Sequence, residues 1–142
     1  MGEASEDADP LLTSYRQLSA TASFNAWAGF EVVRMAEGEC ELRIGWRAAD
    51  MGQYAGFLHA GVIAALLDTA CGFAANTKAS GVLSSNLAVN YLAPAVGAEF
   101  HASGRVVKAG RKQIFTSGEL YAVDLGGSRL VATATAILVP AG

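Results

Sequence analysis

The feature that most constrains the fold is one long apolar segment, residues 59–77 (HAGVIAALLDTACGFAANT), in a chain of 142 residues. It is rich in Ala and Leu, it lacks the alternation of a strand, and Asp68 is its only charged residue. We expect a helix of about five turns, about 28 Å long. Because a helix that is apolar on nearly all sides is normally buried on most of them, the rest of the chain must wrap around it.

Most of the remaining chain has the two-residue period of strands. Alternating residues at 40–46 follow a first run at Val32-Val33, and the break at Glu37-Gly38 predicts a hairpin. Three or four longer strands are expected after the helix, within residues 83–91, 98–108, 113–123 and 129–139. Ala109-Gly110 and Gly126-Gly127 are turn signals between the last three.

The order of these segments predicts an α+β fold. A short helix is expected over residues 11–20 and an irregular loop over 47–58. Long antiparallel strands with segregated helices favour a curved antiparallel sheet wrapped around the one central helix. We expect a single domain over residues 11–142, preceded by a flexible tail over residues 1–10.

Composition excludes several classes of protein. Hydrophobic residues make up 52% of the chain and charged residues 16%, with a net charge of −3, which excludes a disordered chain and makes nucleic acid an unexpected partner. No apolar run reaches the roughly 18 residues of a spanning helix, so no membrane partner is expected. The apolar excess must therefore be buried in the core or in a subunit interface.

The cellular compartment and metal content are also expectations from the sequence. The chain lacks a basic region followed by an apolar stretch at its start, and Cys40 and Cys71 make no disulfide framework. A cytoplasmic location is the simplest expectation. No cluster of His, Cys, Asp and Glu has metal-ligand spacing, so we expect no metal.

The central helix has two different faces. On a helical wheel the residues within about 60° of Asp68 are small, and larger apolar residues lie opposite. The small set is Gly61, Ala64, Ala65, Cys71, Gly72 and Ala75, and the large set is Val62, Ile63, Leu66 and Phe73. Small residues let a second backbone or a ligand approach Asp68 closely.

Asp68 itself has two interpretations. A carboxylate in apolar surroundings is costly unless it is hydrogen-bonded, so it is either a structural group bonded to its neighbours or a catalytic carboxylate. The pattern alone gives these two interpretations about equal weight.

The start of the helix is the second candidate site. Its first amides are unpaired donors at the positive end of the dipole, so those of Ala60 and Gly61 are candidates to hold a developing oxyanion. A plain connecting loop is the alternative. A helical His59 would point away from Asp68, which favours a structural or orienting role over that of a general base.

A distance argument joins the two candidate sites. Ala60 and Asp68 are eight residues apart, which is about 12 Å along one helix. A general base and an oxyanion donor must both lie about 3 Å from the reacting centre. One helix cannot supply both, but two antiparallel copies meeting on their small-residue faces can. If these residues are catalytic, the protein is at least a dimer.

The sequence resembles a known family at these positions. GQYAGFLHAGVIAALLDTACGFAA, then VNYLAPAVG and VVKAGRKQ, are similar to the hotdog-fold acyl-CoA thioesterases, in the branch of the phenylacetate-degradation and 4-hydroxybenzoyl-CoA enzymes. The similarity covers roughly residues 25–139. The spacing of Gln53, His59 and Asp68 matches the family, although the usual His-Gly-Gly is His59-Ala60-Gly61 here.

The resemblance implies residue roles. Asp68 would activate the water or attack the thioester carbonyl, and the sequence does not separate the two. The Ala60 amide of another subunit, helped by Gln53, would polarise that carbonyl. Ser84 or Ser85 would lie near the attacking water, with Asn86 as a weaker choice.

The substrate and partners are also expectations. Lys108, Arg111 and Lys112 are candidates to contact the phosphates of CoA, or are simply a solvated turn. Phe57, with Trp27, Phe30 and Tyr54, is a candidate to line an acyl pocket or else belongs to the core. Aromatic, medium-chain and branched acyl groups all fit such a pocket. No cofactor is expected beyond the CoA of the substrate, and the expected assembly is a homodimer or a pair of such dimers.

Two rival functions remain open. One keeps the fold and makes the protein a hydratase or dehydratase of acyl thioesters, although these usually pair a catalytic His with a carboxylate. The other is a non-catalytic acyl-CoA-binding module, which would bind without turnover.

Overall fold

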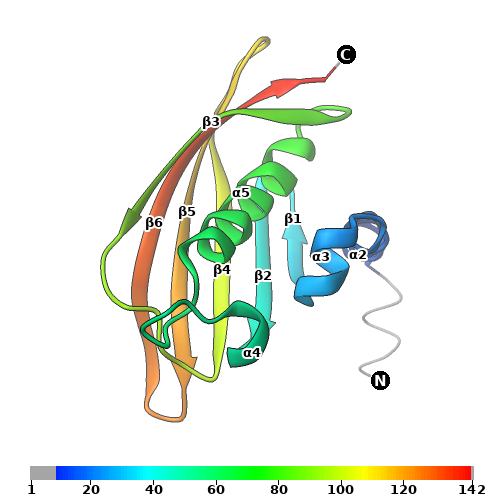
Figure 1. The fold of residues 1–142 in the computed structure, drawn as a ribbon. Helices are drawn as coiled ribbons and strands as arrows, with labels where there is room; N and C mark the ends of the chain where they lie inside the picture. Colours follow the sequence, from blue (N-terminus) through cyan, green and yellow to red (C-terminus); the bar gives the residue numbers. More distant parts are fainter. Residues whose placement is uncertain (1–8, 142) are drawn as a thin grey trace.

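The computed structural model describes residues 9–141 as a six-stranded antiparallel sheet curved around one long helix (Figure 1). The expected α+β architecture is confirmed. The helices are α2 (Pro10–Thr21), α3 (Ser23–Ala28), α4 (Ala48–Met51) and α5 (Ala60–Asn76). The strands are β1 (Glu31–Ala36), β2 (Glu39–Gly45), β3 (Val82–Tyr91), β4 (Glu99–Ala109), β5 (Ile114–Asp124) and β6 (Gly127–Pro140). Residues 1–8 of the expected tail lie outside the described residues.

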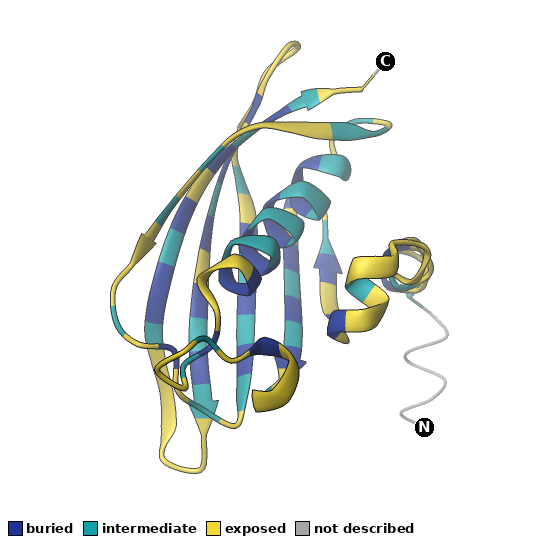
Figure 2. Cartoon of the chain, in the orientation of Figure 1, coloured by how far each residue is buried: buried dark blue, intermediate teal, exposed yellow. Residues whose placement is uncertain are grey.

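The strand order in the sheet places α5 across its concave face. The order is β1-β2-β4-β5-β6-β3, so β3, which follows α5 in the chain, pairs with β6 at the far edge. The chain therefore crosses the sheet through α5, which packs against β2, β4 and β5 as well as β3 and β6. Figure 2 shows the side of α5 toward the sheet as buried. The predicted central helix and the β1–β2 hairpin are both confirmed.

Two short helices were not expected from the sequence. α3 follows α2 and ends at Ala28, where Gly29 forms the C-cap with a φ of 73° that glycine readily adopts. α4 lies within the segment expected as an irregular loop. Helices of four to six residues contain too few turns to show a period, so the hydrophobic pattern does not reveal them.

Two glycines let α5 approach the sheet closely. Gly104 on β4 pairs with Gly118 on β5, beneath the middle of the helix. A Cβ on Gly104 would lie 2.5 Å from the backbone carbonyl of Ala70, and one on Gly118 would lie 3.1 Å from Cys71 Sγ. Because helix backbone cannot move aside as a flexible side chain can, Gly104 sets the distance between helix and sheet.

We expect Gly104→Ala to lower the free energy of unfolding by about 1–3 kcal/mol, the usual cost of overpacking a core. The measurement is urea unfolding, with the change in midpoint read at an unchanged slope. Gly45→Ala is the matched control, since a Cβ at this strand glycine meets nothing within 4 Å. Equal effects of the two substitutions would contradict the close helix–sheet contact.

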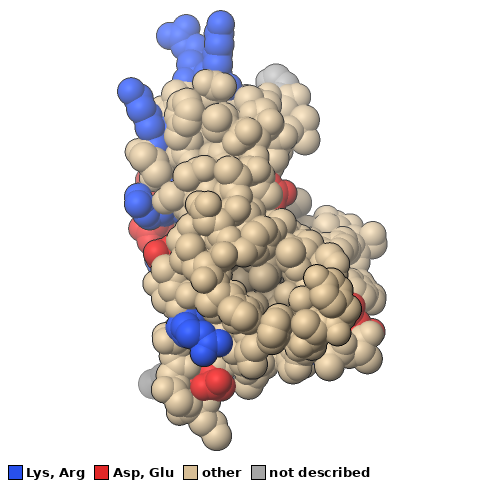
Figure 3. Space-filling model, turned by 60° about the vertical axis from the view of Figure 1, so that its left-hand side comes forward, with Lys and Arg blue, Asp and Glu red and all other residues tan. Residues whose placement is uncertain are grey.

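The edge strand β3 has no charged residue and is largely exposed. Figure 3 shows the side of the molecule around this edge with few Lys, Arg, Asp or Glu side chains. An exposed, uncharged sheet edge is a template for pairing with another chain. Within residues 9–141, no helix is both long and apolar enough to cross a membrane.

Candidate functional site

His59 caps the start of α5. Its backbone is extended, and its ring Nδ1 accepts a hydrogen bond of 2.8 Å from the Gly61 amide. Because Nδ1 is the acceptor, the neutral ring carries its proton on Nε2. His59 is exposed and lies before the helix, so it does not project toward the sheet as a helical His59 would. This position agrees with the structural or orienting role expected from the sequence, which stays a prediction.

The cap leaves one of the two candidate amides free. The Gly61 N–H is bonded to His59, whereas the Ala60 N–H has no acceptor among residues 9–141. The Ala60 carbonyl accepts a 3.1 Å hydrogen bond from Tyr91 Oη, which ties β3 to the helix start. Ala60 is therefore the amide at this end of α5 that is available to an incoming oxygen. The sequence pattern placed Tyr91 on a strand but did not reveal this contact.

The preceding loop is held by the side chain of Gln53. Its Oε1 accepts hydrogen bonds from the amides of Ala55 and Phe57, the latter at 3.3 Å. The backbone N–H of Gln53 donates to the Phe57 carbonyl at 2.8 Å, and Gly52 forms an isolated antiparallel β-bridge with Leu58. With the oxygen engaged, the carboxamide NH₂ remains available as a donor.

A cavity of about 480 Å³ opens beside the free amide. We call it the amide cavity. Its lining residues are Gln53, Tyr54, Phe57, Leu58, His59, Ala60, Ile63, Tyr91, Leu92, Ala93, Pro94 and Ala95. It brings together the expected residues Gln53, Phe57, His59 and Ala60 in a mostly apolar setting.

Asp68 lies half-buried on the exposed side of α5 and is bonded to Ser84. Ser84 Oγ donates to Asp68 Oδ1 at 2.6 Å. The β3–β6 register shifts between Ser84 and Asn86, and Ser85 Oγ instead donates to the Ile137 carbonyl at 3.2 Å. A bulge re-aims neighbouring side chains. Of the three polar candidates on β3, Ser84 is the one that reaches the carboxylate.

A second cavity, of about 520 Å³, surrounds this pair. We call it the carboxylate cavity. It is lined by Leu18, Asn25, Asp68, Thr69, Gly72, Phe73, Asn76, Gly81, Val82, Leu83, Ser84 and Leu138. Leu18 and Asn25 come from α2 and α3, so the N-terminal helices form one wall. The sequence pattern gave no signal for this wall, because nothing local indicates where a short helix packs.

The faces of α5 differ in part from those expected on the helical wheel. Phe73 lines the carboxylate cavity and contacts Tyr15 of α2 edge to face, with ring centroids 5.2 Å apart. Cys71 and Ala75 are fully buried beside residues of β5 and β6. The expectation was wrong at these three positions because the curved sheet covers one flank of the helix and leaves the other to α2.

The two cavities are separate within one chain. They share no lining residue, and Ala60 and Asp68 are about 12 Å apart along α5 at 1.5 Å per residue. Neither cavity by itself contains both a free helix amide and the carboxylate. Chemistry that needs both requires two copies of the chain.

The cysteines offer no alternative nucleophile. Both Cys40 and Cys71 are buried and unpaired with each other as a disulfide. Burial raises the pKa of the Cys71 thiol, and it does the same for Cys40. Both thiols therefore stay protonated at neutral pH, where the thiolate is the reactive form.

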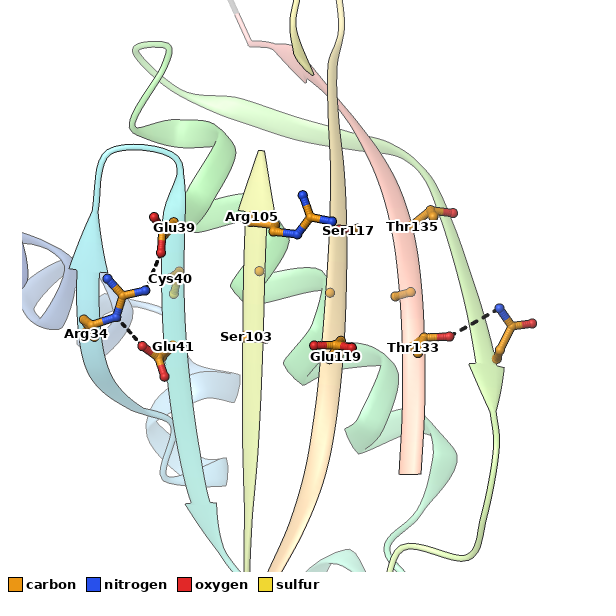
Figure 4. A pocket seen from close by; sticks show the side chains of 14 residues that line it. Arg34, Glu39, Cys40, Glu41, Ser103, Arg105, Ser117, Glu119, Thr133 and Thr135 are labelled. Carbon is orange, nitrogen blue, oxygen red and sulfur yellow. Dashed lines mark hydrogen bonds and ion pairs between the residues drawn. The ribbon is translucent and has the colours of Figure 1, made fainter. Parts of the chain in front are cut away.

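A polar trough of about 560 Å³ lies on the other face of the sheet. Because Gly104 faces α5, its neighbours Ser103 and Arg105 face away from the helix. Figure 4 shows the trough crossing several strands, with Arg34 bonded to Glu39 and Glu41. None of the expected site residues lines it.

The three basic candidates lie around the β4–β5 turn. Lys108, Arg111 and Lys112 are exposed and form no ion pair with another described residue. Figure 3 shows Lys and Arg side chains gathered at this end of the molecule. The placement suits contact with an anion but does not select one.

Comparison with known proteins agrees with this architecture. The model of the thioesterase superfamily matches residues 55–133. A protein of Halobacterium salinarum whose name carries the word esterase is 34% identical over 116 residues, which cover 77% of this chain and 74% of that protein.

Solved structures show the same fold. A thioesterase family protein from Silicibacter pomeroyi is 35% identical, with a TM-score of 0.84 over 87% of this chain and 93% of that one. The PaaI protein from the phenylacetic acid degradation operon of E. coli has a TM-score of 0.83 at 19% identity, over 93% and 94% of the two chains, and supports the fold alone. The resemblance stated from the sequence is confirmed, and the chain belongs to the thioesterase superfamily as a hydrolase of thioesters.

Proposed function

We propose that this protein hydrolyses an acyl-CoA to the free acid and CoA at a site formed by two copies of the chain. Asp68 of one copy activates water or attacks the thioester carbonyl, and the Ala60 amide of the other copy, beside Gln53, holds the carbonyl oxygen. The observation that carries the proposal is the separation of the free amide and the Ser84-bonded carboxylate into two cavities of one chain.

The charge distribution supports an assembly of two copies. β3 is an exposed, uncharged edge next to the stripe of α5 that contains Asp68, and such a surface is typical of an interface. Association through it would bring the α5 helices together in antiparallel orientation. Lys108, Arg111 and Lys112 are then candidates to bind the phosphates of CoA, and a pair of such dimers is the larger assembly that we propose.

The test of the function is thiol release from a panel of aromatic, branched and medium-chain acyl-CoAs. Turnover with saturation on at least one of them supports the thioesterase. Hydration of an enoyl-CoA without thiol release would favour the hydratase. Saturable binding of acyl-CoA without any turnover would favour the binding module. A mass measurement in solution reports the dimer at the same time.

Ser84 is expected to orient Asp68. We expect Ser84→Ala to lower kcat about 10–100-fold, because a hydrogen bond to a charged group contributes about 1.5–3 kcal/mol. The matched control is Ser85→Ala, whose hydroxyl bonds to a backbone carbonyl and not to Asp68. If Ser85→Ala lowers kcat more than Ser84→Ala does, the assignment of the assisting serine is overturned.

A further inference from the structure

Tyr54 is a fully exposed aromatic side chain on an ordered loop. Its relative exposure is 102%. Three hydrogen bonds hold the loop on which it lies. The backbone N–H groups of Ala55 and Phe57 donate to Gln53 Oε1, and the Gly56 N–H donates to the Gln53 carbonyl at 2.9 Å. The backbone around Tyr54 is therefore held in place, while its ring, which also lines the amide cavity of its own chain, stays open to solvent. A ring presented in this way suits contact with another surface.

The carboxylate cavity has the complementary shape. A Cβ built on Gly72 would meet nothing within 4 Å, so the floor of the cavity is open. Its apolar lining includes Leu18 and Leu83, which are 47% and 63% exposed, and the partly buried Phe73. Such a surface has room for one flat ring.

Two side chains that line the cavity, those of Asn25 and Asn76, each have a free hydrogen-bond acceptor. Asn25 Nδ2 donates to Ser19 Oγ at 3.3 Å, and Asn76 Nδ2 donates to Tyr15 Oη at 2.9 Å. Both bonds point the NH₂ groups toward α2. The Oδ1 atoms of these two side chains accept nothing from any described residue. A tyrosine hydroxyl is a donor of the kind that these oxygens lack.

The orientation of the two copies brings these features together. If Ala60 of one copy lies beside Asp68 of the other and the helices are antiparallel, residues before 60 in one copy run alongside residues after 68 in the other. The loop at 52–58 then lies over the segment from Gly72 to Asn76. This step rests on the proposed function, since that function requires Ala60 and Asp68 to meet.

We propose that Tyr54 of each copy closes the carboxylate cavity of the other copy. Its ring packs against Leu18 and Phe73, and its hydroxyl donates to the amide oxygen of Asn25 or Asn76. The acyl group is then bound in the space left between this ring and Asp68. Tyr54 thereby limits the length of the acyl group and excludes water from the reacting centre.

The contact is tested by cross-linking, without any need for turnover. In the Tyr54→Cys, Asn76→Cys double variant, a bifunctional maleimide that spans about 10 Å is expected to give a covalent dimer on a denaturing gel, since a tyrosine side chain and its hydrogen bond separate the two backbones by more than a disulfide can bridge. The two positions cannot join within one chain, because Tyr54 precedes the start of α5 and Asn76 is its last residue, and the helix between them is about 24 Å long. Cys40 and Cys71 are buried and do not compete.

The matched control is the Leu125→Cys, Asn76→Cys variant, since Leu125 is as exposed as Tyr54 but lies on the β5–β6 turn. Equal cross-linking of both variants, or none with Tyr54→Cys in a protein that elutes as wild type, overturns the proposal. Specific cross-linking of the double variant, together with a wild-type protein that turns over none of the acyl-CoAs, would overturn the proposed function and leave the contact standing.

A second readout is acyl-chain selectivity. Tyr54→Ala is expected to lower kcat/KM for the best short acyl-CoA about tenfold and to extend the longest chain accepted, because a filled pocket discriminates by chain length. Tyr54→Phe keeps the ring, so the chain-length limit should stay and kcat/KM should fall only about threefold, the value of one neutral hydrogen bond. An unchanged chain-length profile in Tyr54→Ala would contradict the role of the ring.

Discussion

Replacing Asp68 by Asn is expected to lower kcat for thioester hydrolysis by about 10²–10⁴-fold, the usual contribution of a positioned general base. Asn has nearly the same volume and keeps an oxygen for the hydrogen bond from Ser84 Oγ. The substitution removes only the negative charge that draws a proton from water or forms a bond to the carbonyl. KM should change little, since the thioester is held mainly by other groups.

The measurement is steady-state thiol release on the best acyl-CoA of the panel, with the unfolding midpoint checked in parallel. Asp124→Asn is the matched control, because this exposed aspartate only accepts a bond from the Gly126 amide on the β5–β6 turn. Activity within a few fold of wild type in a folded Asp68→Asn protein would show that Asp68 is structural. That result would return the carboxylate to the first of its two interpretations from the sequence.

Removing the amide of Ala60 is expected to have the second largest effect. Ala60→Pro should lower kcat by about 10²–10³-fold, as for other losses of an oxyanion donor. Ala60 is the first residue of α5, where proline is well tolerated, and the extended backbone of His59 is compatible with a following proline. The substitution therefore deletes one N–H with little cost to the helix.

Mixing the two variants tests whether the site is shared between copies. In a mixed dimer of Asp68→Asn and Ala60→Pro, one site contains both changes and the other contains neither. If subunits exchange freely, half of the dimers are mixed and about a quarter of wild-type activity should return. Each variant mixed with itself is the control. If mixing restores nothing although mixed dimers form, Asp68 and Ala60 act in the same chain and the two-copy site is wrong.

The central elements were predictable because their patterns are local. The apolar run at 59–77 is buried on most sides, and the alternating strands are buried on one face. The hydrophobic period of the sequence indicates both kinds of burial directly. Asp68 could be selected as a candidate for the same reason, since a single charged residue in an apolar helical segment can be recognised from the sequence alone. The short helices α3 and α4 were missed because each has too few residues to show a helical repeat of apolar positions.

The candidate site was only partly predictable. The Gln53, His59, Ala60 and Asp68 spacing was visible in the sequence, but the choice of Ser84 over Ser85 was not. That choice depends on a bulge in β3, which arises from its pairing with β6 about fifty residues later. The wall formed by Leu18 and Asn25 was invisible for a similar reason, because it depends on where α2 and α3 dock.

The sequence by itself determined the fold class, the one buried helix, its lone carboxylate and the need for two copies if that carboxylate and the helix amide act together. These follow from hydrophobic period and from the fixed rise of a helix. Only the tertiary structure decided that His59 occupies the Gly61 amide and leaves Ala60 free, that Ser84 reaches Asp68, and that the two cavities share no residue. Those outcomes depend on register, bulges and side-chain direction between segments far apart in the chain, which no local pattern encodes.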